Sequence, residues 1–404
     1  MRRSALACLT LVALAACSDE MSSPSALDSA PALESSASSV VRVVDADEAS
    51  LRDALAQASV DAGITRIRIK GPDLIAVSES LVFTGTQALE IVGDGVILDG
   101  TGSTGDGLVF TGGGDVRLRK LTVQNFPGTG VVVAIPAAAT GTVHVDVRDV
   151  QILDNGLHGL WVDDQLTNSD ASLDVEVLRS AVLRNGFGGV SDFDGIRVNE
   201  GGVGSITYRM RNSDANENGA DGLELDETGD GDVLFDIAQS HLDRNGPQDP
   251  NDLDDGFDAD EIGAGSLRGR IVQTTLNGNY DQGLDLDEDD DGDIDVELRN
   301  VTAIGNIGEN VKFSETGTGS ILTRMVLVDG SGSVEEEGMV LEEEDDGDLH
   351  ARITRSEFSN NDKEGVQLDQ LDAGMGEATL IRVELKNNGG GPLDTDGVSV
   401  TQKP

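Results

Sequence analysis

Four segments of the chain share one pattern: DGLELDETGDGDV at 221–233, QGLDLDEDDDGDI at 282–294, ENVKFSETGTGSI at 309–321 and EGMVLEEEDDGDL at 337–349. Looser copies begin at His158, Asp194, Asp255 and Glu364. A pattern that returns about every 27 residues, with occasional insertions, is typical of a solenoid, in which each copy forms one coil. Every position of the pattern then becomes a row of side chains along the stack.

One copy predicts two short strands that are joined by turns. Leu223 and Leu225 alternate with acidic residues, and residues 233–237 alternate again between apolar and other side chains. This period of two indicates strands with one buried face. Asn218-Gly219 marks a turn, because both residue types tolerate positive φ. No helical run separates the copies, so the pattern argues against alternating strands and helices.

The register of the copies follows from four rows of residues. The key glycine falls at Gly159, Gly195, Gly222, Gly256, Gly283, Gly338, Gly365 and Gly397, with Asn310 replacing it once. The first apolar position holds Leu160, Ile196, Leu223, Phe257, Leu284, Val311, Met339, Val366 and Val398. The second holds Val162, Val198, Leu225, Ala259, Leu286, Phe313, Leu341, Leu368 and Val400. A turn asparagine recurs at Asn155, Asn185, Asn218, Asn245, Asn277, Asn306, Asn360 and Asn387, and we expect these side chains to bond along the stack.

The chain resembles the right-handed parallel β-helix, or pectin lyase-like, superfamily. The resemblance is carried by the turn asparagines, by NG-x-x-G-[LV] coils such as Asn218–Leu223, and by a capping-box pattern at residues 50–58 that predicts a short helix over the first coil. It covers roughly residues 40–404 and implies an all-β, right-handed parallel β-helix solenoid with about 27 residues per coil. Because the superfamily hosts lyases, hydrolases, epimerases and adhesins, the resemblance specifies the fold and not the activity.

The beginning of the chain is similar to a bacterial lipoprotein signal. In residues 1–16, two arginines precede an apolar run that is too short to span a membrane, and the run leads into Leu14-Ala15-Ala16-Cys17. We expect Cys17 to carry lipid, residues 17–40 to form a flexible tether rich in Ser, Ala and Pro, and residues 41–404 to form the β-helix domain. The predicted location is the bacterial cell envelope, at the outer membrane or cell surface.

The composition limits the choice of partners. The formal net charge is −47, which argues against nucleic acid and favours metal cations or basic partners. Aromatic residues make up only 3% of the chain, so we expect a narrow core of stacked aliphatic side chains. The two cysteines are Cys8 and Cys17, which leaves no disulfide in the exported chain.

Two acidic rows, expected to point outward, are the candidate metal site. One begins Asp163, Asn199, Asp226, Asp260 and Asp287, and the next begins Asp164, Glu200, Glu227, Glu261 and Glu288. Rows of carboxylates beside turn carbonyls suit Ca²⁺. The predicted ligands are Asp226, Glu227, Asp230, Asp232, Asp260, Glu261, Asp287, Glu288, Asp291 and Asp293. The alternative is a solvated acidic face that keeps the protein soluble. By contrast, a row on the second strand alternates in sign over six coils: Glu176, Arg209, Asp236, Arg270, Glu297, Arg324.

A further outward row is the candidate ligand-binding face, with Trp161, Glu224, Asp258 and Asp285. Our main hypothesis is a lipid-anchored β-helix whose Ca²⁺-bearing face binds a surface partner or carbohydrate. The alternative is a Ca²⁺-dependent polysaccharide lyase or related carbohydrate-active enzyme, for which the resemblance to pectate lyases implies a basic residue, Arg197 or Lys312, as proton acceptor. In the simpler interpretation both residues only pair with neighbouring charges. A purely structural envelope protein is the remaining possibility, and whether the chain is an enzyme stays open.

Overall fold

The computed structural model describes residues 40–404, apart from 72, 190–191 and 250–252. The predicted signal peptide, the predicted lipidation site Cys17 and nearly all of the predicted tether lie outside the described residues. The described residues belong to one compact unit. Within the described part, no helix has the length and apolar character needed to cross a membrane.

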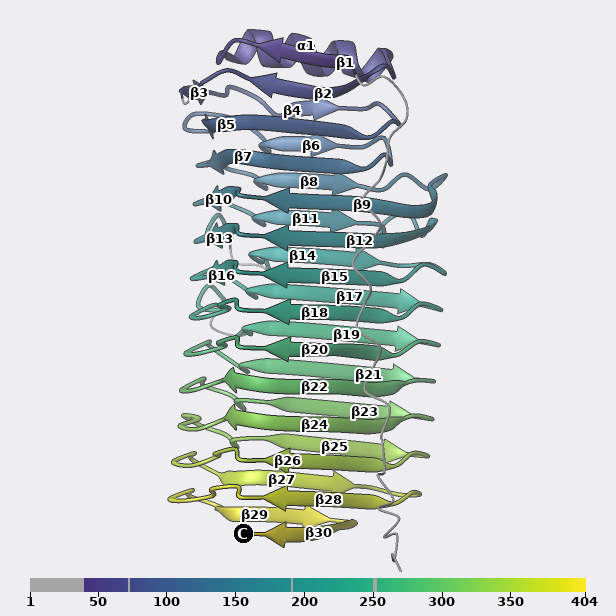
Figure 1. The fold of residues 1–404 in the computed structure, drawn as a ribbon, viewed down its shortest axis with the longest axis vertical. Helices are drawn as coiled ribbons and strands as arrows, with labels where there is room; N and C mark the ends of the chain where they lie inside the picture. The colour runs from purple at the N-terminus through teal and green to yellow at the C-terminus, as the bar shows by residue number, and fades with distance from the viewer. Residues whose placement is uncertain (1–39, 72, 190–191, 250–252) are drawn as a thin grey trace, which may run out of the picture. The chain divides into compact units, whose positions relative to one another are not determined.

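The described chain winds into two parallel sheets that share about 13 turns, which confirms the predicted all-β solenoid (Figure 1). The 12-stranded sheet, here called sheet B, contains β4 (Leu81–Phe83), β6 (Leu108–Phe110), β8 (Val131–Ala134), β11 (Leu160–Asp163), β14 (Ile196–Glu200), β17 (Leu223–Gly229), β19 (Phe257–Gly263), β21 (Leu284–Asp290), β23 (Lys312–Gly317), β25 (Val340–Asp345), β27 (Glu364–Gln370) and β29 (Gly391–Asp396).

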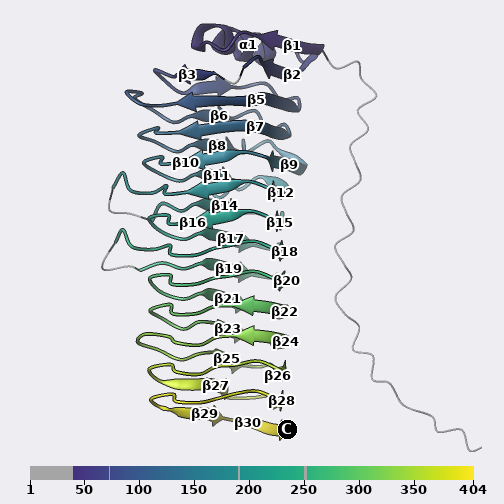
Figure 2. The same cartoon turned by 60° about the vertical axis from the view of Figure 1, so that its left-hand side comes forward.

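The 18-stranded sheet, sheet A, runs along the other side of the coils (Figure 2). Its long strands are β1 (Val40–Val44), β2 (Ile64–Ile69), β5 (Leu89–Asp99), β7 (Val116–Gln124), β9 (Thr140–Arg148), β12 (Asp170–Leu178), β15 (Ile206–Arg211), β18 (Val233–Ala238), β20 (Leu267–Val272), β22 (Asp293–Thr302), β24 (Ser320–Asp329), β26 (Leu349–Thr354), β28 (Gly376–Ile381) and β30 (Val398–Lys403). The short strands are β3 (Leu74–Ala76), β10 (Gln151–Leu153), β13 (Ala181–Leu183) and β16 (Asp214–Asn216).

The predicted register is confirmed up to the last coil. Leu223 pairs with Phe257 and Leu225 with Ala259, and both rows are fully buried between the sheets. The predicted final copy at Gly397 is wrong, because Val398 lies in β30 of sheet A and pairs with β28. The strand of sheet B in that coil is β29, which places Leu393 beside Val366.

A single helix among the described residues, α1 (Glu48–Val60), covers the first coil at the top of Figure 1. Leu51, Ala54, Leu55 and Ala58 are its buried residues. The predicted cap is displaced by one turn: Asp47, and not Ser50, is the N-cap, and its side chain accepts a hydrogen bond from the Ser50 backbone N–H at 2.9 Å. The helix shields the edge of the first coil, which would otherwise be open to pairing.

A buried ladder of asparagines joins the coils at one corner. Each side-chain oxygen accepts from the backbone N–H and the amide of the asparagine in the preceding coil, as Asn245 does from Asn218 at 3.0 and 3.1 Å. Three predicted members lie outside this buried ladder, which uses Asn279, Asn361 and Asn388 where Asn277, Asn360 and Asn387 were expected. Asn387 still bonds along the stack, because its amide donates to Asn360 Oδ1 at 3.2 Å.

Asn310, the exception in the glycine row, completes this ladder. The next coil carries Ser333 where the ladder asparagine would be, and Asn310 bridges the gap by accepting from Asn306 at 2.9 Å and donating to Asn361 at 3.2 Å. Elsewhere a side chain at the key glycine would collide with the ladder, since a Cβ on Gly283 would lie 2.5 Å from the Asn306 amide nitrogen. The glycine is therefore replaced where the ladder residue is shorter.

The row of alternating charge on sheet A is confirmed. The pairs Glu176–Arg209, Arg209–Asp236, Asp236–Arg270, Arg270–Glu297 and Glu297–Arg324 are all direct neighbours in register. Arg270 bonds Asp236 at 2.9 Å. Sheet A therefore neutralises charge along this row, whereas the outward row of sheet B has basic members only at Arg197 and Lys312 among the described residues.

Candidate cation-binding face of sheet B

The two predicted acidic rows lie on opposite sides of sheet B. Leu223 and Leu225 face the core, so the alternation of a strand places Asp226 on the outer face and Glu227 inside. Asp226 pairs with Asp260, which pairs with Asp287, and these three form the outer row. Glu227, Glu261 and Glu288 have no exposed surface. The expectation that the glutamate row points outward is therefore wrong.

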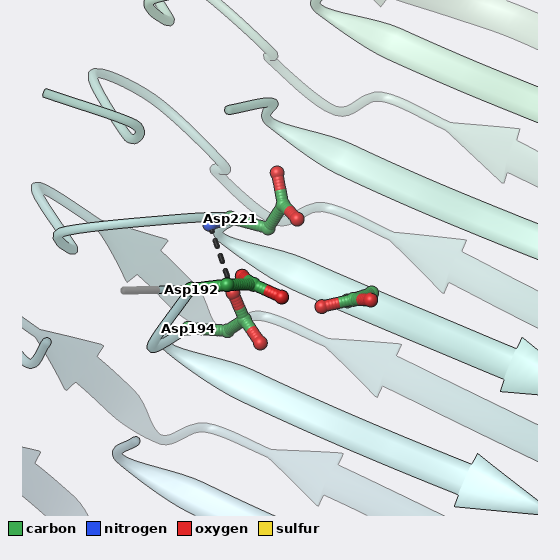
Figure 3. Close-up of side chains that lie close together, drawn as sticks. Asp192, Asp194 and Asp221 are labelled. Atoms are coloured by element: carbon green, nitrogen blue, oxygen red, sulfur yellow. Dashed lines mark hydrogen bonds between the residues drawn. The ribbon is translucent and has the colours of Figure 1, made fainter. Parts of the chain in front are cut away.

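Outside the predicted metal set, four carboxylates converge on the outer face near β14 and β17. Asp192, Asp194, Asp221 and Glu224 each offer an oxygen within 4.8 Å of the others. Figure 3 shows Asp192, Asp194 and Asp221 together, with the Asp221 backbone N–H donating to Asp194 Oδ1 at 3.1 Å. One oxygen of Asp194 is thus committed to the backbone of the next coil, and its other oxygen lies 3.4 Å from Arg197.

Arg197 lies among these carboxylates as their counter-ion. Its guanidinium is 2.6 Å from Glu224 Oε2 and 2.7 Å from Asp226 Oδ2, and it also contacts Asp192 and Asp194. The Glu224 contact is an ion pair without the angles of a hydrogen bond. Burial alone would lower the pKa of Arg197, but the surrounding carboxylates raise it. The group is therefore held as a cation.

A second group, Asp255, Asp258 and Asp285, lies two coils further along and also converges within 4.8 Å. Lys312 bonds Asp285 at 2.9 Å and approaches Asp287 at 3.3 Å. Among the described residues, neither Asp255 nor Asp258 forms an ion pair with a basic side chain. The negative charge of these three carboxylates therefore exceeds the positive charge of the basic side chain beside them, Lys312.

The carboxylates of this second group bind protons unusually tightly. Burial, reinforced by neighbouring carboxylates, raises the pKa of Asp258 and Asp255 well above the ordinary value. Burial and the charge of Asp287 raise the pKa of Asp285 to about 8, and burial and Asp226 raise that of Asp260 to about 7. Crowded like charges raise a carboxyl pKa, and a bound cation relieves that crowding.

The arrangement fits a hard cation better than it fits proton abstraction. Three convergent carboxylates supply the oxygen ligands that Ca²⁺ prefers, and Asp260 and Asp287 lie on the same outer face. Lys312 is held by Asp285 and Asp287, which raise its pKa although burial opposes them. A proton acceptor has to be deprotonated, and Lys312 and Arg197 are both held in their charged forms.

The remaining predicted metal ligands are spread around the turn. Asp230 and Asp291 are exposed. Asp232 and Asp293 are half-buried and lie 3.5 and 3.9 Å from Arg268. These turn aspartates do not converge with the outer row in a single group of carboxylates among the described residues.

An aromatic group borders the first acidic cluster. The Trp161 ring stacks on His158 at 5.5 Å, and Phe193 meets the same histidine edge-on at 5.3 Å. The His158 Nδ1 accepts from the Asp194 backbone N–H at 2.9 Å. The buried Trp161 Nε1 has no hydrogen-bond partner among the described residues. The pairing of the strands places Trp161 in the same outward row as Arg197, Glu224, Asp258 and Asp285, as predicted.

The row just before the key glycine was missed as a functional row, although it opens every copy of the sequence pattern. It places Asp194, Asp221 and Asp255 in successive coils, each bonded to the backbone N–H of the next coil. The signal was the acidic residue directly before the glycine in most copies, with His158 and Gln282 as exceptions.

Comparisons with solved structures find distant β-helix proteins. Pectate lyase Pel9A is 15% identical with a TM-score of 0.44, covering 77% of this chain and 78% of that one. The Azotobacter vinelandii mannuronan C-5 epimerase AlgE4 A-module is 11% identical with a TM-score of 0.34, covering 89% of this chain and 97% of that one. No protein-family model and no curated protein sequence matches the chain. With TM-scores below 0.5, these likenesses carry no argument about function.

Proposed function

We propose that this protein is a lipid-anchored β-helix of the bacterial cell envelope that binds Ca²⁺ on the outer face of sheet B and uses that face to hold a carbohydrate. The observation that supports it is the convergence of Asp255, Asp258 and Asp285, of which two have no basic partner among the described residues. Ca²⁺ bound there would offer coordination positions to hydroxyl or carboxylate oxygens of a glycan.

The flanking groups support a binding role. Trp161 supplies an aromatic surface in the same row, which suits the apolar face of a sugar ring. Arg197 and Lys312 bracket the uncompensated carboxylates and keep the face from being uniformly negative. The anchor at Cys17 and the cell-surface location are proposals from the sequence pattern alone. We favour binding over lyase chemistry because both candidate bases are engaged as counter-ions.

Thermal unfolding of the full chain, with Ca²⁺ and then with chelator at constant ionic strength, tests the proposal. A ligand of the native state must raise Tm by mass action. We expect a rise that is reduced in Asp258→Asn/Asp285→Asn and preserved in the control Glu297→Gln, which lies in the alternating row of sheet A. An equal rise with monovalent salt, in all three proteins, would show a solvated acidic face without a site.

A glycan-array screen of the same proteins tests the carbohydrate part. Binding that needs both Ca²⁺ and the Asp258/Asp285 pair is the expected result. Incubation of polyuronates with the wild-type chain, followed by ultraviolet absorbance of unsaturated products, tests the lyase alternative. New absorbance that is lost in Arg197→Ala or Lys312→Ala would replace the binding proposal by the enzymatic one.

A further inference from the structure

The interior of the solenoid contains a row of carboxylates that the outer face does not use. Its members share a position just after the outer aspartate row, and neighbouring members pair directly between adjacent strands of sheet B: Glu227, Glu261, Glu288, Glu315 and Glu343. All five side chains have 0% exposure. Strands in a sheet lie about 4.8 Å apart, so the carboxylates form a continuous file along the axis.

Both oxygens of all five glutamates lack a hydrogen-bond partner among the described residues. Adjacent carboxyls, such as Glu261 and Glu288, come within reach of each other, but two ionised carboxylates have no proton to share. Burying an unpaired charge costs several kcal/mol for each ion, so the file has to be neutralised, either by bound cations or by protons.

The residues at the two ends of the file differ from the five in the middle, because the chain provides a hydrogen-bond partner for each of them. Gln370 occupies the same row beside Glu343, and its amide accepts from the Leu349 backbone N–H at 2.8 Å and donates to the Gly347 carbonyl at 3.3 Å. At the other end, one oxygen of Glu200 accepts from the Gly202 backbone N–H at 3.0 Å, and its other oxygen has no partner among the described residues. Both carboxylate oxygens therefore lack a partner only in the five middle coils of this row.

Gln370 also shows that this position accepts a neutral amide. If the fold required only a planar polar group, glutamine would serve in every coil, yet five successive coils carry an acid. The other titratable groups that act on the file are Asp232, Asp289, Asp345, Asp346 and Asp348, which are also acidic. Negative charge is thus the recurring property of the row, and carboxylate oxygens are hard ligands.

We propose that the interior glutamate row holds a file of Ca²⁺ ions between the coils. Each ion would be shared by glutamates from two successive coils, and the file would stabilise the stack from within. It is separate from the outer cluster, because Asp258 and Glu261 lie on opposite sides of the same strand. The proposal does not depend on the outer face binding calcium.

Calcium counting on the full chain tests the proposal. The protein is dialysed to equilibrium against Ca²⁺ and its calcium is measured by mass spectrometry, alongside Glu261→Gln/Glu288→Gln and the outer-face control Asp258→Asn/Asp285→Asn. We expect the interior variant to bind fewer ions per chain and to lose part of the Ca²⁺-dependent rise in Tm. The outer-face variant should retain the interior ions, so the two proposals fail separately.

Glu343→Gln is the second variant, in case the double substitution does not fold. Glu343 lies beside Gln370, which already places a neutral amide in this row. The substitution therefore adds a second amide next to the first. The variant should also bind less calcium than the wild type. If Glu343→Gln and every folded interior variant bind as much Ca²⁺ as the wild type, with the same rise in Tm, protons neutralise the row and the proposal is overturned.

Discussion

Without calcium, the protein should lose stability as the pH rises from 5 to 9.5. Burial raises the pKa of Glu288 from 4.5 to about 9 and that of Glu261 from 4.5 to about 8. For a group whose folded pKa lies above its unfolded pKa, the stabilisation is complete below the unfolded value and is lost as the pH rises through the folded value. In chelator, the loss should therefore fall between pH 4.5 and about 9.

The size of the effect at Glu288 follows from its pKa. One pKa unit corresponds to about 1.36 kcal/mol, so the change from 4.5 to about 9 corresponds to roughly 6 kcal/mol of the free energy of unfolding. This is an upper value, because the charges of neighbouring glutamates contribute to the shift and would relax together. Glutamine does not titrate, so Glu288→Gln should remove this part of the pH dependence.

Urea unfolding in chelator, at pH 5, 7 and 9.5, measures the difference. At pH 5, Glu288→Gln should lie within about 1 kcal/mol of the wild type, since an amide and a protonated carboxyl are similar in shape and polarity. At pH 9.5 the variant should be more stable by up to about 6 kcal/mol. Glu297→Gln, on sheet A, serves as the control. A wild type that is equally stable at pH 5 and 9.5 in chelator would refute the reasoning.

Three other substitutions test single contacts. Arg197→Ala should lower the free energy of unfolding by about 3–5 kcal/mol near pH 7, because it leaves buried carboxylates without their counter-ion, and an unchanged urea midpoint would contradict this. Gly292→Ala should destabilise the turn strongly, since its Cβ would lie 1.5 Å from the Gly265 carbonyl oxygen. A Tm within roughly 1–2 °C of the wild type, the effect of a neutral change, would contradict this and show that the backbone shifts to make room. Asn310→Gly should cost about 2 kcal/mol by interrupting the buried ladder, and Asn310→Gly/Ser333→Asn should recover most of it if the two positions compensate as proposed.

The sequence was sufficient for the coil and its register because the pattern repeats. Leu223, Leu225 and their equivalents are apolar in every copy, and a slip of one residue would expose all of them. The register failed where the repeat is irregular. The prediction placed the last copy at Gly397, because this is the next glycine after Gly365 that precedes an apolar pair. The strand of sheet B in that coil, β29, instead begins at Gly391. Asn277 and Asn279 lie in one turn, and spacing alone does not choose between them.

The side of the glutamate row was predicted wrongly because two rules conflict there. The alternation that places Leu225 inside also places Glu227 inside, whereas a glutamate is almost never fully buried unless it is paired. The chemical character of glutamate predicts an outward side chain, but the strand geometry places this side chain inside. The outer clusters could not be predicted either, since they join Asp194 and Asp221 before the strand with Glu224 within it, and their convergence depends on the bend between them.

Anomalous X-ray diffraction from crystals grown with Ca²⁺, recorded at a long wavelength, tests the central claim most directly. The account predicts anomalous peaks about 2.3–2.6 Å from carboxylate oxygens of Asp258 and Asp285, the usual Ca²⁺–oxygen distance. Further peaks should lie along the interior file between Glu227 and Glu343. Crystals that are saturated with Ca²⁺ and show no anomalous peak at either place would contradict the account.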